Sequence, residues 1–119
     1  MNAGGAGLFR KQHKYRAQRT YCANGHWHPS KAEAKRCDEL HILEKAGEIT
    51  HLTFQPKFPV HINGIKVFTY IADFSYFPLK PEKGGRIIED VKGVLTAIYK
   101  LKKKAVEAYY PGVKIVEVR

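Results

Sequence analysis

The sequence predicts an α/β protein of the α+β type, built as a single domain around an αβββαβ core. Three observations support this class. The chain has 119 residues, which suits one domain, and 44% of them are apolar, which is enough for a core. Two segments carry apolar residues at helical spacing. Four other segments are rich in β-branched and aromatic residues.

We expect residues 1–19 to form a flexible basic arm and residues 20–119 to form the folded domain. The arm begins with the Gly-rich sequence MNAGGAG and has no apolar periodicity. A solvated tail without a binding role is the alternative. If the arm binds a polyanion, its phosphate contacts are Arg10, Lys11, Lys14, Arg16 and Arg19.

A small hairpin is predicted over residues 20–28, because Asn24-Gly25 is a strong signal for a type I′ turn. Trp27 is expected to pack against the sheet or the first helix. That helix should begin after Ser30, a good N-cap, and run to about Ala46. Gly47 suits its C-terminal cap.

Three strands should follow, over Leu52–Ile62, Val67–Tyr76 and Arg86–Lys92. Pro56 and Pro59 mark the first of them as an irregular or edge strand. Asn63-Gly64 predicts a second tight turn, and residues 77–85 form a Pro/Gly loop.

A second helix is predicted over residues 95–110, with a last strand over residues 113–118. Lysines lie on one face of this helix. The other face, which we expect to be buried, carries Leu95, Ile98, Leu101, Ala105, Val106 and Tyr109.

The formal net charge is +10, from 21 Lys and Arg against 11 Asp and Glu, which indicates a polyanionic partner. Nucleic acid is the first candidate, since phosphate neutralisation drives its binding. No apolar run has the length of a membrane span or a signal peptide, so a soluble intracellular protein is expected. The two cysteines are expected to be free thiols.

The residues that could perform chemistry are acids placed among apolar neighbours. Asp90 and Lys92 point to the same side of the third strand, because side chains alternate along a strand. A surface ion pair would explain them alone. Asp73, however, lies within an apolar and aromatic strand, where a carboxylate needs a compensating partner. A divalent cation such as Mg²⁺ or Mn²⁺ would reconcile two carboxylates on neighbouring strands.

Glu33 is a third candidate acid, because it shares the apolar face of the first helix with Cys37 and Leu40. Two roles are open for it. It can close a capping box with Ser30, or it can serve a functional site, and one residue can do both.

The ordered set of a helix acid, a strand Asp and a D-x-K on the next strand resembles the PD-(D/E)xK nuclease superfamily. Small phage and prophage endonucleases related to Holliday-junction resolvases are the most similar group. The resemblance rests on the stretches SKAEAKRCDEL, FQPKFPV, YIADFSY and IIEDVKGVLT. It implies a restriction-endonuclease-like fold for residues 20–119.

The resemblance also implies residue roles. Asp73 and Asp90 would bind Mg²⁺, with Mn²⁺ as a substitute, and Glu33 would be a further metal ligand. Lys92 would orient or activate the attacking water. Gln55 would touch the site or the DNA, or be structural. The resemblance further implies a homodimer acting on DNA in a bacterial cytoplasm, phage- or prophage-encoded, with no small-molecule substrate.

The second helix is expected to contribute DNA contacts after the catalytic strand. Thr96, near its start, could bond a phosphate. A solvated helix face is the alternative for its lysines, which are Lys100, Lys102, Lys103 and Lys104.

A zinc site can also be drawn from Cys22, His26, His28 and Cys37. The spacing C-x3-H-x-H-x8-C matches no compact zinc finger, and Cys37 is expected in the helix core. Both points speak against zinc.

The sequence therefore predicts a Mg²⁺-dependent endodeoxyribonuclease, selective for branched or junction DNA in phage recombination or DNA processing. One alternative is a basic nucleic-acid-binding domain without activity. Another is a nuclease subunit of a larger mobile-element complex. The paired acids Asp73 and Asp90 favour catalysis, because a pure binder gains nothing from carboxylates near phosphate.

Overall fold

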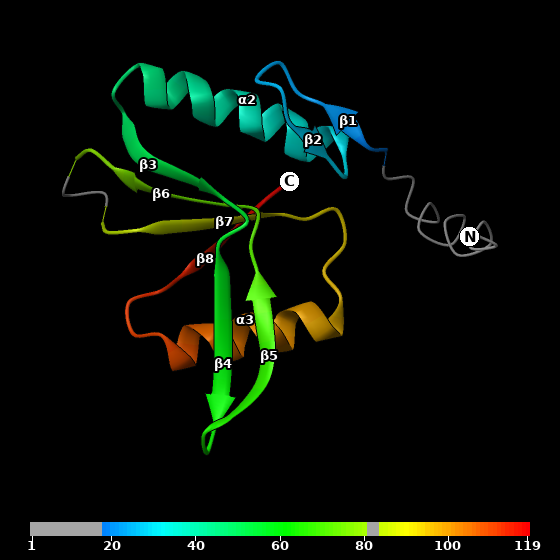
Figure 1. The fold of residues 1–119 in the computed structure, drawn as a ribbon, viewed down its shortest axis with the longest axis vertical. Coiled ribbons are helices and arrows are strands. Elements are labelled where there is room, and N and C mark those ends of the chain that lie inside the picture. Colours follow the sequence, from blue (N-terminus) through cyan, green and yellow to red (C-terminus); the bar gives the residue numbers. More distant parts are fainter. Residues whose placement is uncertain (1–17, 81–83) are drawn as a thin grey trace. The chain divides into compact units, whose positions relative to one another are not determined.

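A computed structural model describes residues 18–80 and 84–119 (Figure 1). Of the predicted phosphate contacts, Arg10, Lys11, Lys14 and Arg16 lie outside these residues. The chain divides into two compact units, here called the N-terminal unit, which ends at Glu39, and the C-terminal unit, Leu40–Arg119. The described residues combine two helices with eight strands, which confirms the predicted α+β class. Neither helix is long and apolar enough to cross a membrane.

A short hairpin opens the N-terminal unit. Its strands are β1 (Thr20–Tyr21) and β2 (Trp27–His28), paired antiparallel. Gly25 has a positive φ of 86°, but Asn24 does not, so the predicted type I′ turn is wrong. The turn closes instead through a hydrogen bond from the Gly25 N–H to the Cys22 carbonyl, and the Asn24 side chain donates to Asp38 Oδ1 over 2.8 Å.

Helix α2 (Lys31–Lys45) begins where the sequence predicts. The Glu33 N–H donates to Ser30 Oγ over 3.1 Å, which confirms Ser30 as the N-cap. Beyond the helix end, the Glu48 N–H donates to the Leu43 carbonyl, while Gly47 adopts a φ of 78°. This left-handed residue is the expected C-terminal stop.

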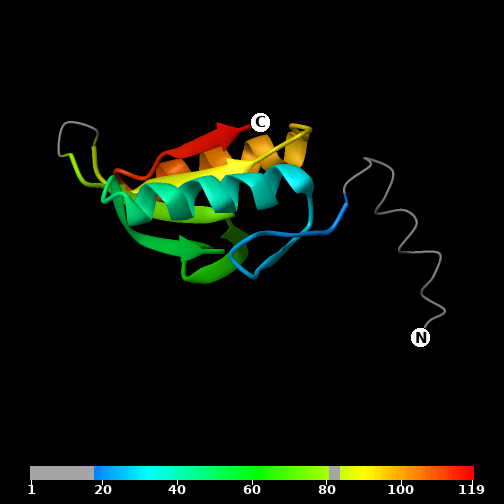
Figure 2. The ribbon, with the colours of Figure 1, turned by 90° about the horizontal axis from the view of Figure 1, so that it is seen from above.

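A four-stranded sheet forms the centre of the C-terminal unit, in the order β3-β6-β7-β8. Its strands are β3 (Ile49–Phe54), β6 (Phe74–Pro78), β7 (Ile87–Val91) and β8 (Ile115–Val118). The β7–β8 pair is parallel and the other two pairs are antiparallel. Figure 2 shows β3 and β8 at the two edges. With its helices, this sheet has the predicted αβββαβ order.

The first two predicted strands are each broken in two, so their prediction as continuous strands is wrong. After β3 the chain turns at Gln55, which has a φ of 51°, and continues as β4 (Lys57–Ile62). Opposite it, β5 (Ile65–Ile71) ends before β6 begins. The Ala72 N–H donates to the Pro56 carbonyl, so a backbone hydrogen bond joins the two breaks.

The segments β4 and β5 pair only with each other, as a hairpin. Asn63 and Gly64 at its tip have φ values of 51° and 77°, as a type I′ turn requires. The second predicted tight turn is therefore confirmed.

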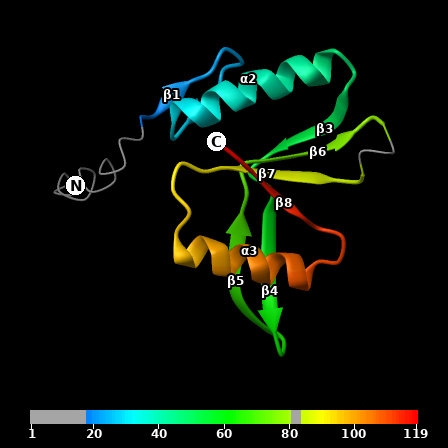
Figure 3. The ribbon, with the colours of Figure 1, turned by 180° about the vertical axis from the view of Figure 1, so that it is seen from behind.

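Helix α3 (Ala97–Tyr109) lies across the β4–β5 hairpin (Figures 1 and 3). The predicted buried face is wrong in part, because Ile98 is 65% and Leu101 69% exposed. The helix buries Val106, as predicted, and also Tyr99, which was not on the predicted face. The Tyr99 ring packs 6.4 Å from the Tyr70 ring. The buried core around them comprises Phe58, Val60, Tyr70, Ala72, Ile88, Tyr99, Val106 and Ile115.

Phe74 should be an anchor of the sheet, because it is the largest fully buried side chain in the described residues. We expect Phe74→Ala to lower the free energy of unfolding by about 3–5 kcal/mol in urea titrations. Phe77→Ala, on the same strand but exposed, is the control and should cost far less. Equal losses in the two variants would contradict the core assignment.

Candidate functional site

Asp73 is held against strand β7, although it lies in the break just before β6 rather than within a strand. Its N–H donates to the Glu89 carbonyl over 3.1 Å. Its Oδ2 accepts the Val91 N–H over 2.7 Å. The Asp73 carboxylate is therefore fixed on the strand that carries Asp90.

Asp90 and Lys92 lie on the same side of the strand end, as predicted. Asp90 is only 2% exposed, and its Oδ2 accepts a hydrogen bond from the Tyr70 hydroxyl. Its Oδ1 lies 3.5 Å from Lys92 Nζ. The Lys92 side chain is 28% exposed, and its ammonium sits 4.4 Å from the centre of the Tyr99 ring. The ammonium is thus positioned by protein but accessible to solvent.

Burial raises the pKa of Asp90 to about 6. The neighbouring Lys92 ammonium lowers the pKa of Asp90, and the negative charge of Glu117 raises it by a smaller amount. The site therefore contains a carboxylate whose charge is incompletely compensated by the protein alone.

Glu89, the neighbour of Asp90, points away from this group. It is buried and accepts a hydrogen bond from the Tyr76 hydroxyl. This contact agrees with the D-x-K spacing, which favours Asp90 over Glu89.

Gln55 contacts Asp73 through a backbone hydrogen bond. The Gln55 N–H donates to the Asp73 carbonyl over 3.0 Å, while its side chain is exposed. Gln55 adopts the left-handed region, which is costly for a residue with a Cβ and is often retained at functional sites. Thr96 is the N-cap of α3, because its Oγ1 accepts the Tyr99 N–H over 3.1 Å.

The predicted phosphate-binding lysines of α3 fall into two groups. Lys100 and Lys104 are exposed. Lys103 Nζ lies 3.0 Å from Glu117 Oε2, and Lys102 Nζ lies 5.6 Å from the centre of the Phe68 ring. The exposed pair is therefore better suited to contact an external phosphate.

In the N-terminal unit, Glu33 is buried at the first turn of α2, as its position on the apolar face predicts. Its Oε2 lies 2.7 Å from His28 Nδ1, and its N–H is bonded to Ser30. Within its own unit, the Glu33 backbone N–H is therefore capped by Ser30, and the Glu33 carboxylate is the partner of a histidine.

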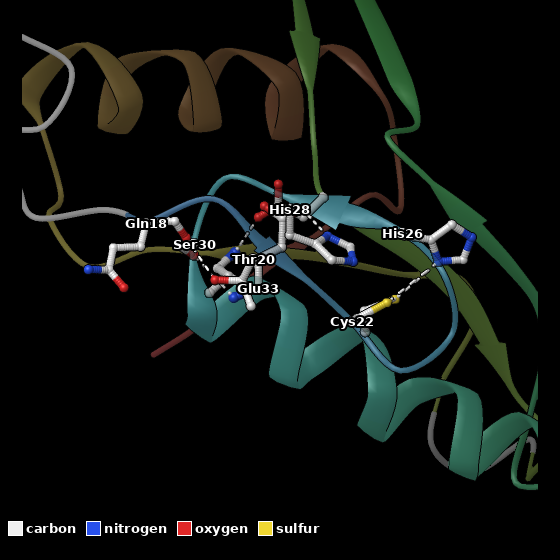
Figure 4. A network of polar contacts seen from close by, with 10 residues as sticks. Gln18, Thr20, Cys22, His26, His28, Ser30 and Glu33 are labelled. Atoms are coloured by element: carbon white, nitrogen blue, oxygen red, sulfur yellow. Dashed lines mark hydrogen bonds and ion pairs between the residues drawn. The ribbon is translucent and has the colours of Figure 1, made fainter. Parts of the chain in front are cut away.

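His28 also belongs to a second group of chemically active side chains, of which Figure 4 labels Cys22, His26 and His28. We call it the Cys/His cluster, and it consists of Cys22, His26, His28 and Cys37. One ligand atom from each residue lies within 4.8 Å of the others, so the cluster could hold a metal ion. The spacing of these residues in the sequence matches no compact zinc finger. The hairpin brings Cys22, His26 and His28 together beside Cys37 on α2.

Cys37 is fully buried, as predicted, but within this cluster. Burial, aided by the contact with Cys22, raises the pKa of its thiol to about 12, so the metal-free thiol is neutral. Trp27 packs beside Tyr21 of its own hairpin, so the prediction that it packs against the sheet or the first helix is wrong. It is 58% exposed, with its ring 4.9 Å from the Tyr21 ring and 5.0 Å from Arg19 Cζ.

The chain belongs to the family described as "Protein of unknown function (DUF1064)", whose profile matches residues 12–119. No curated protein and no solved structure matches the chain. The family description names no activity.

The raised pKa of Asp90 predicts a pH-dependent stability in EDTA. A carboxyl whose folded pKa lies above its unfolded value destabilises the fold as pH rises from about 4 to above 6. Asp90→Asn removes that cost, so the variant should gain up to about 3 kcal/mol over wild type at neutral pH and little at pH about 4. Urea titrations at both pH values measure this gain. A difference that does not change with pH would contradict it.

Proposed function

We propose that this chain is a metal-dependent DNA endonuclease that hydrolyses phosphodiester bonds, with Asp73, Asp90 and Lys92 as its active-site residues. One observation carries the proposal. The pairing of β6 with β7 brings the Asp73 carboxylate to the Val91 N–H, and the Lys92 ammonium lies 3.5 Å from Asp90 on the same side of that strand end. Two acids and a lysine are thus gathered at one strand end of a chain with a net charge of +10.

The donor set suits a hard divalent cation. Asp73 and Asp90 offer carboxylate oxygens, which Mg²⁺ and Mn²⁺ prefer over nitrogen or sulfur. Mg²⁺ commonly binds through one or two carboxylates and keeps several waters. The incompletely compensated charge of buried Asp90 is a further reason to expect a cation there.

Different residues of the chain have different roles at this site. Tyr70 and the Val91 N–H fix the two carboxylates, so little reorganisation is needed when substrate binds. A bound divalent cation would supply a water of lowered pKa and polarise the phosphoryl oxygens. Lys92 holds a positive charge beside the site, where it can stabilise the developing phosphate charge and orient the attacking water.

The role of Glu33 as a further ligand of this site stays a prediction from the superfamily resemblance. The same applies to a C2 homodimer, which symmetric cleavage of a junction would require. We further propose that the enzyme selects branched or junction DNA, in phage recombination or DNA processing within a bacterial cytoplasm.

Cutting should depend on both metal and the named residues. We would incubate the protein with a labelled four-way junction, a matched linear duplex and single-stranded DNA, in Mg²⁺, Mn²⁺ or EDTA. Asp90→Ala, Asp73→Ala and Lys92→Ala should each lower the rate at least about a hundredfold, because each removes a group that stabilises the transition state. Faster cutting of the junction would support the structure-selective role.

The matched control is Lys114→Ala, which removes one exposed lysine outside the site and should cut like wild type. Tight DNA binding by wild type without cutting in either metal would overturn the proposal. It would leave the basic nucleic-acid-binding domain as the function. Cutting that appears only after a partner protein is added would indicate a subunit of a larger complex.

DNA affinity should depend on salt through the exposed lysines of α3. We expect the double variant Lys100→Ala, Lys104→Ala to weaken binding to all three DNA forms alike. The slope of log K against log salt should fall by about 2, since each phosphate contact contributes about 0.9. Fluorescence anisotropy in EDTA measures this slope. An unchanged slope would place the DNA on another face.

A further inference from the structure

The Cys/His cluster combines two thiols and two imidazoles, which are soft and borderline donors. Cys22 Sγ lies 3.6 Å from Cys37 Sγ, and His26 Nδ1 lies 3.8 Å and 3.7 Å from these two sulfurs. A tetrahedral zinc ion with bonds of about 2.3 Å to sulfur and about 2.0 Å to nitrogen separates its ligand atoms by roughly 3.3–3.8 Å. The three measured edges therefore have the size of a zinc tetrahedron.

A disulfide does not explain the cluster. The sulfur–sulfur separation of 3.6 Å far exceeds a bond of about 2.05 Å, so neither cysteine is in a disulfide. Apolar packing accounts for buried thiols, since free cysteine is among the most buried residue types. Apolar packing does not explain why two imidazoles lie beside these thiols.

The fourth ligand, His28, is held by a carboxylate. Its Nδ1 lies 2.7 Å from Glu33 Oε2, so the buried Nε2 is the ring nitrogen available to a metal. A ligating histidine that is hydrogen-bonded through its other nitrogen to a carboxylate is a common arrangement around zinc. The Ser30 cap holds Glu33 in the first turn of α2, where this contact forms.

The N-terminal unit has little else to stabilise it. Among its described residues, the buried side chains are Cys22, His28, Glu33, Ala34 and Cys37. Ala34 is the one apolar member that is neither in the cluster nor bonded to it. The hairpin strands have two residues each, which is too short for independent stability. A metal ion is the usual substitute for such a missing apolar core.

We propose that Cys22, His26, His28 and Cys37 form a structural zinc site that fastens the β1–β2 hairpin to α2, with Glu33 as a positioning residue for His28. Binding exchanges two thiol protons for Zn²⁺, giving a Zn(Cys)₂(His)₂ centre and releasing two protons to solvent. All four ligands come from the chain, so no position is open for catalysis. The site is independent of the proposed nuclease centre, which uses oxygen ligands.

The test uses the full chain, purified under reductant, treated with EDTA and reconstituted with Zn²⁺ or Co²⁺. We expect about one zinc ion per chain by elemental analysis. The Co²⁺ form should show the intense visible bands of tetrahedral cobalt and a thiolate charge-transfer band in the ultraviolet. An octahedral cobalt spectrum, zinc far below one per chain, or a Cys22–Cys37 disulfide in the reconstituted protein would overturn the site.

Variants assign the ligands. His26→Ala changes a half-buried residue and should fold, but it should weaken zinc binding more than about a hundredfold in chelator competition. His51→Asn is the control, since it removes an exposed imidazole elsewhere and asparagine tolerates the positive φ there. It should bind zinc like wild type. Equal affinities in the two variants would contradict the assignment.

One further variant tests the positioning role of Glu33, and a second separates this inference from the nuclease proposal. Glu33→Gln should keep the zinc but weaken its binding about 10–100-fold, as expected for loss of an orienting carboxylate. An unchanged zinc affinity would overturn that role. Asp90→Ala should retain full zinc whether or not the protein cuts DNA, so failure of either proposal is recognised separately.

Discussion

The buried carboxylate of Asp90 is the constraint on which the C-terminal unit depends. It is bonded to Tyr70 from β5 and paired with Lys92 beyond β7. Asp73, three residues after Tyr70, also contacts β7. In an unbroken strand the side chains of Tyr70 and Asp73 would lie on opposite faces. The break between β5 and β6 changes the direction of the chain between these two residues. The Tyr70 hydroxyl can therefore contact Asp90 while the Asp73 carboxylate contacts the Val91 N–H.

Local signals in the sequence predicted the helices, the order of elements along the chain and the Asn63-Gly64 turn, since caps and turn residues act on their neighbours. They could not place the strand breaks. Gln55 adopts its left-handed conformation beside the Asp73 carbonyl, a partner distant in sequence. The buried face of α3 was also misassigned, because Tyr99 is selected by its contacts with Tyr70 and Lys92 rather than by periodicity.

The candidate site was predicted in its C-terminal part, because alternation along one strand puts Asp90 and Lys92 together. The Cys/His cluster was recognised in the sequence but was judged against as a zinc site, because its spacing matches no zinc finger. Its members are placed by a hairpin folding beside a helix, and a rule based on zinc-finger spacing cannot detect this. Glu33 lies at the first turn of α2, within the N-terminal unit. Its contact with His28 gives it a physical role that the superfamily pattern alone does not indicate.

The parallel pairing of β7 with β8 has a consequence for synthesis of the chain on the ribosome. The Lys92 N–H donates to the Val118 carbonyl, so the backbone at the D-x-K strand end is fixed by a strand that follows a whole intervening helix. A nascent chain exposes β7 with one unpaired edge until β8 has emerged. The lysine therefore reaches its final position only after translation has passed the last strand.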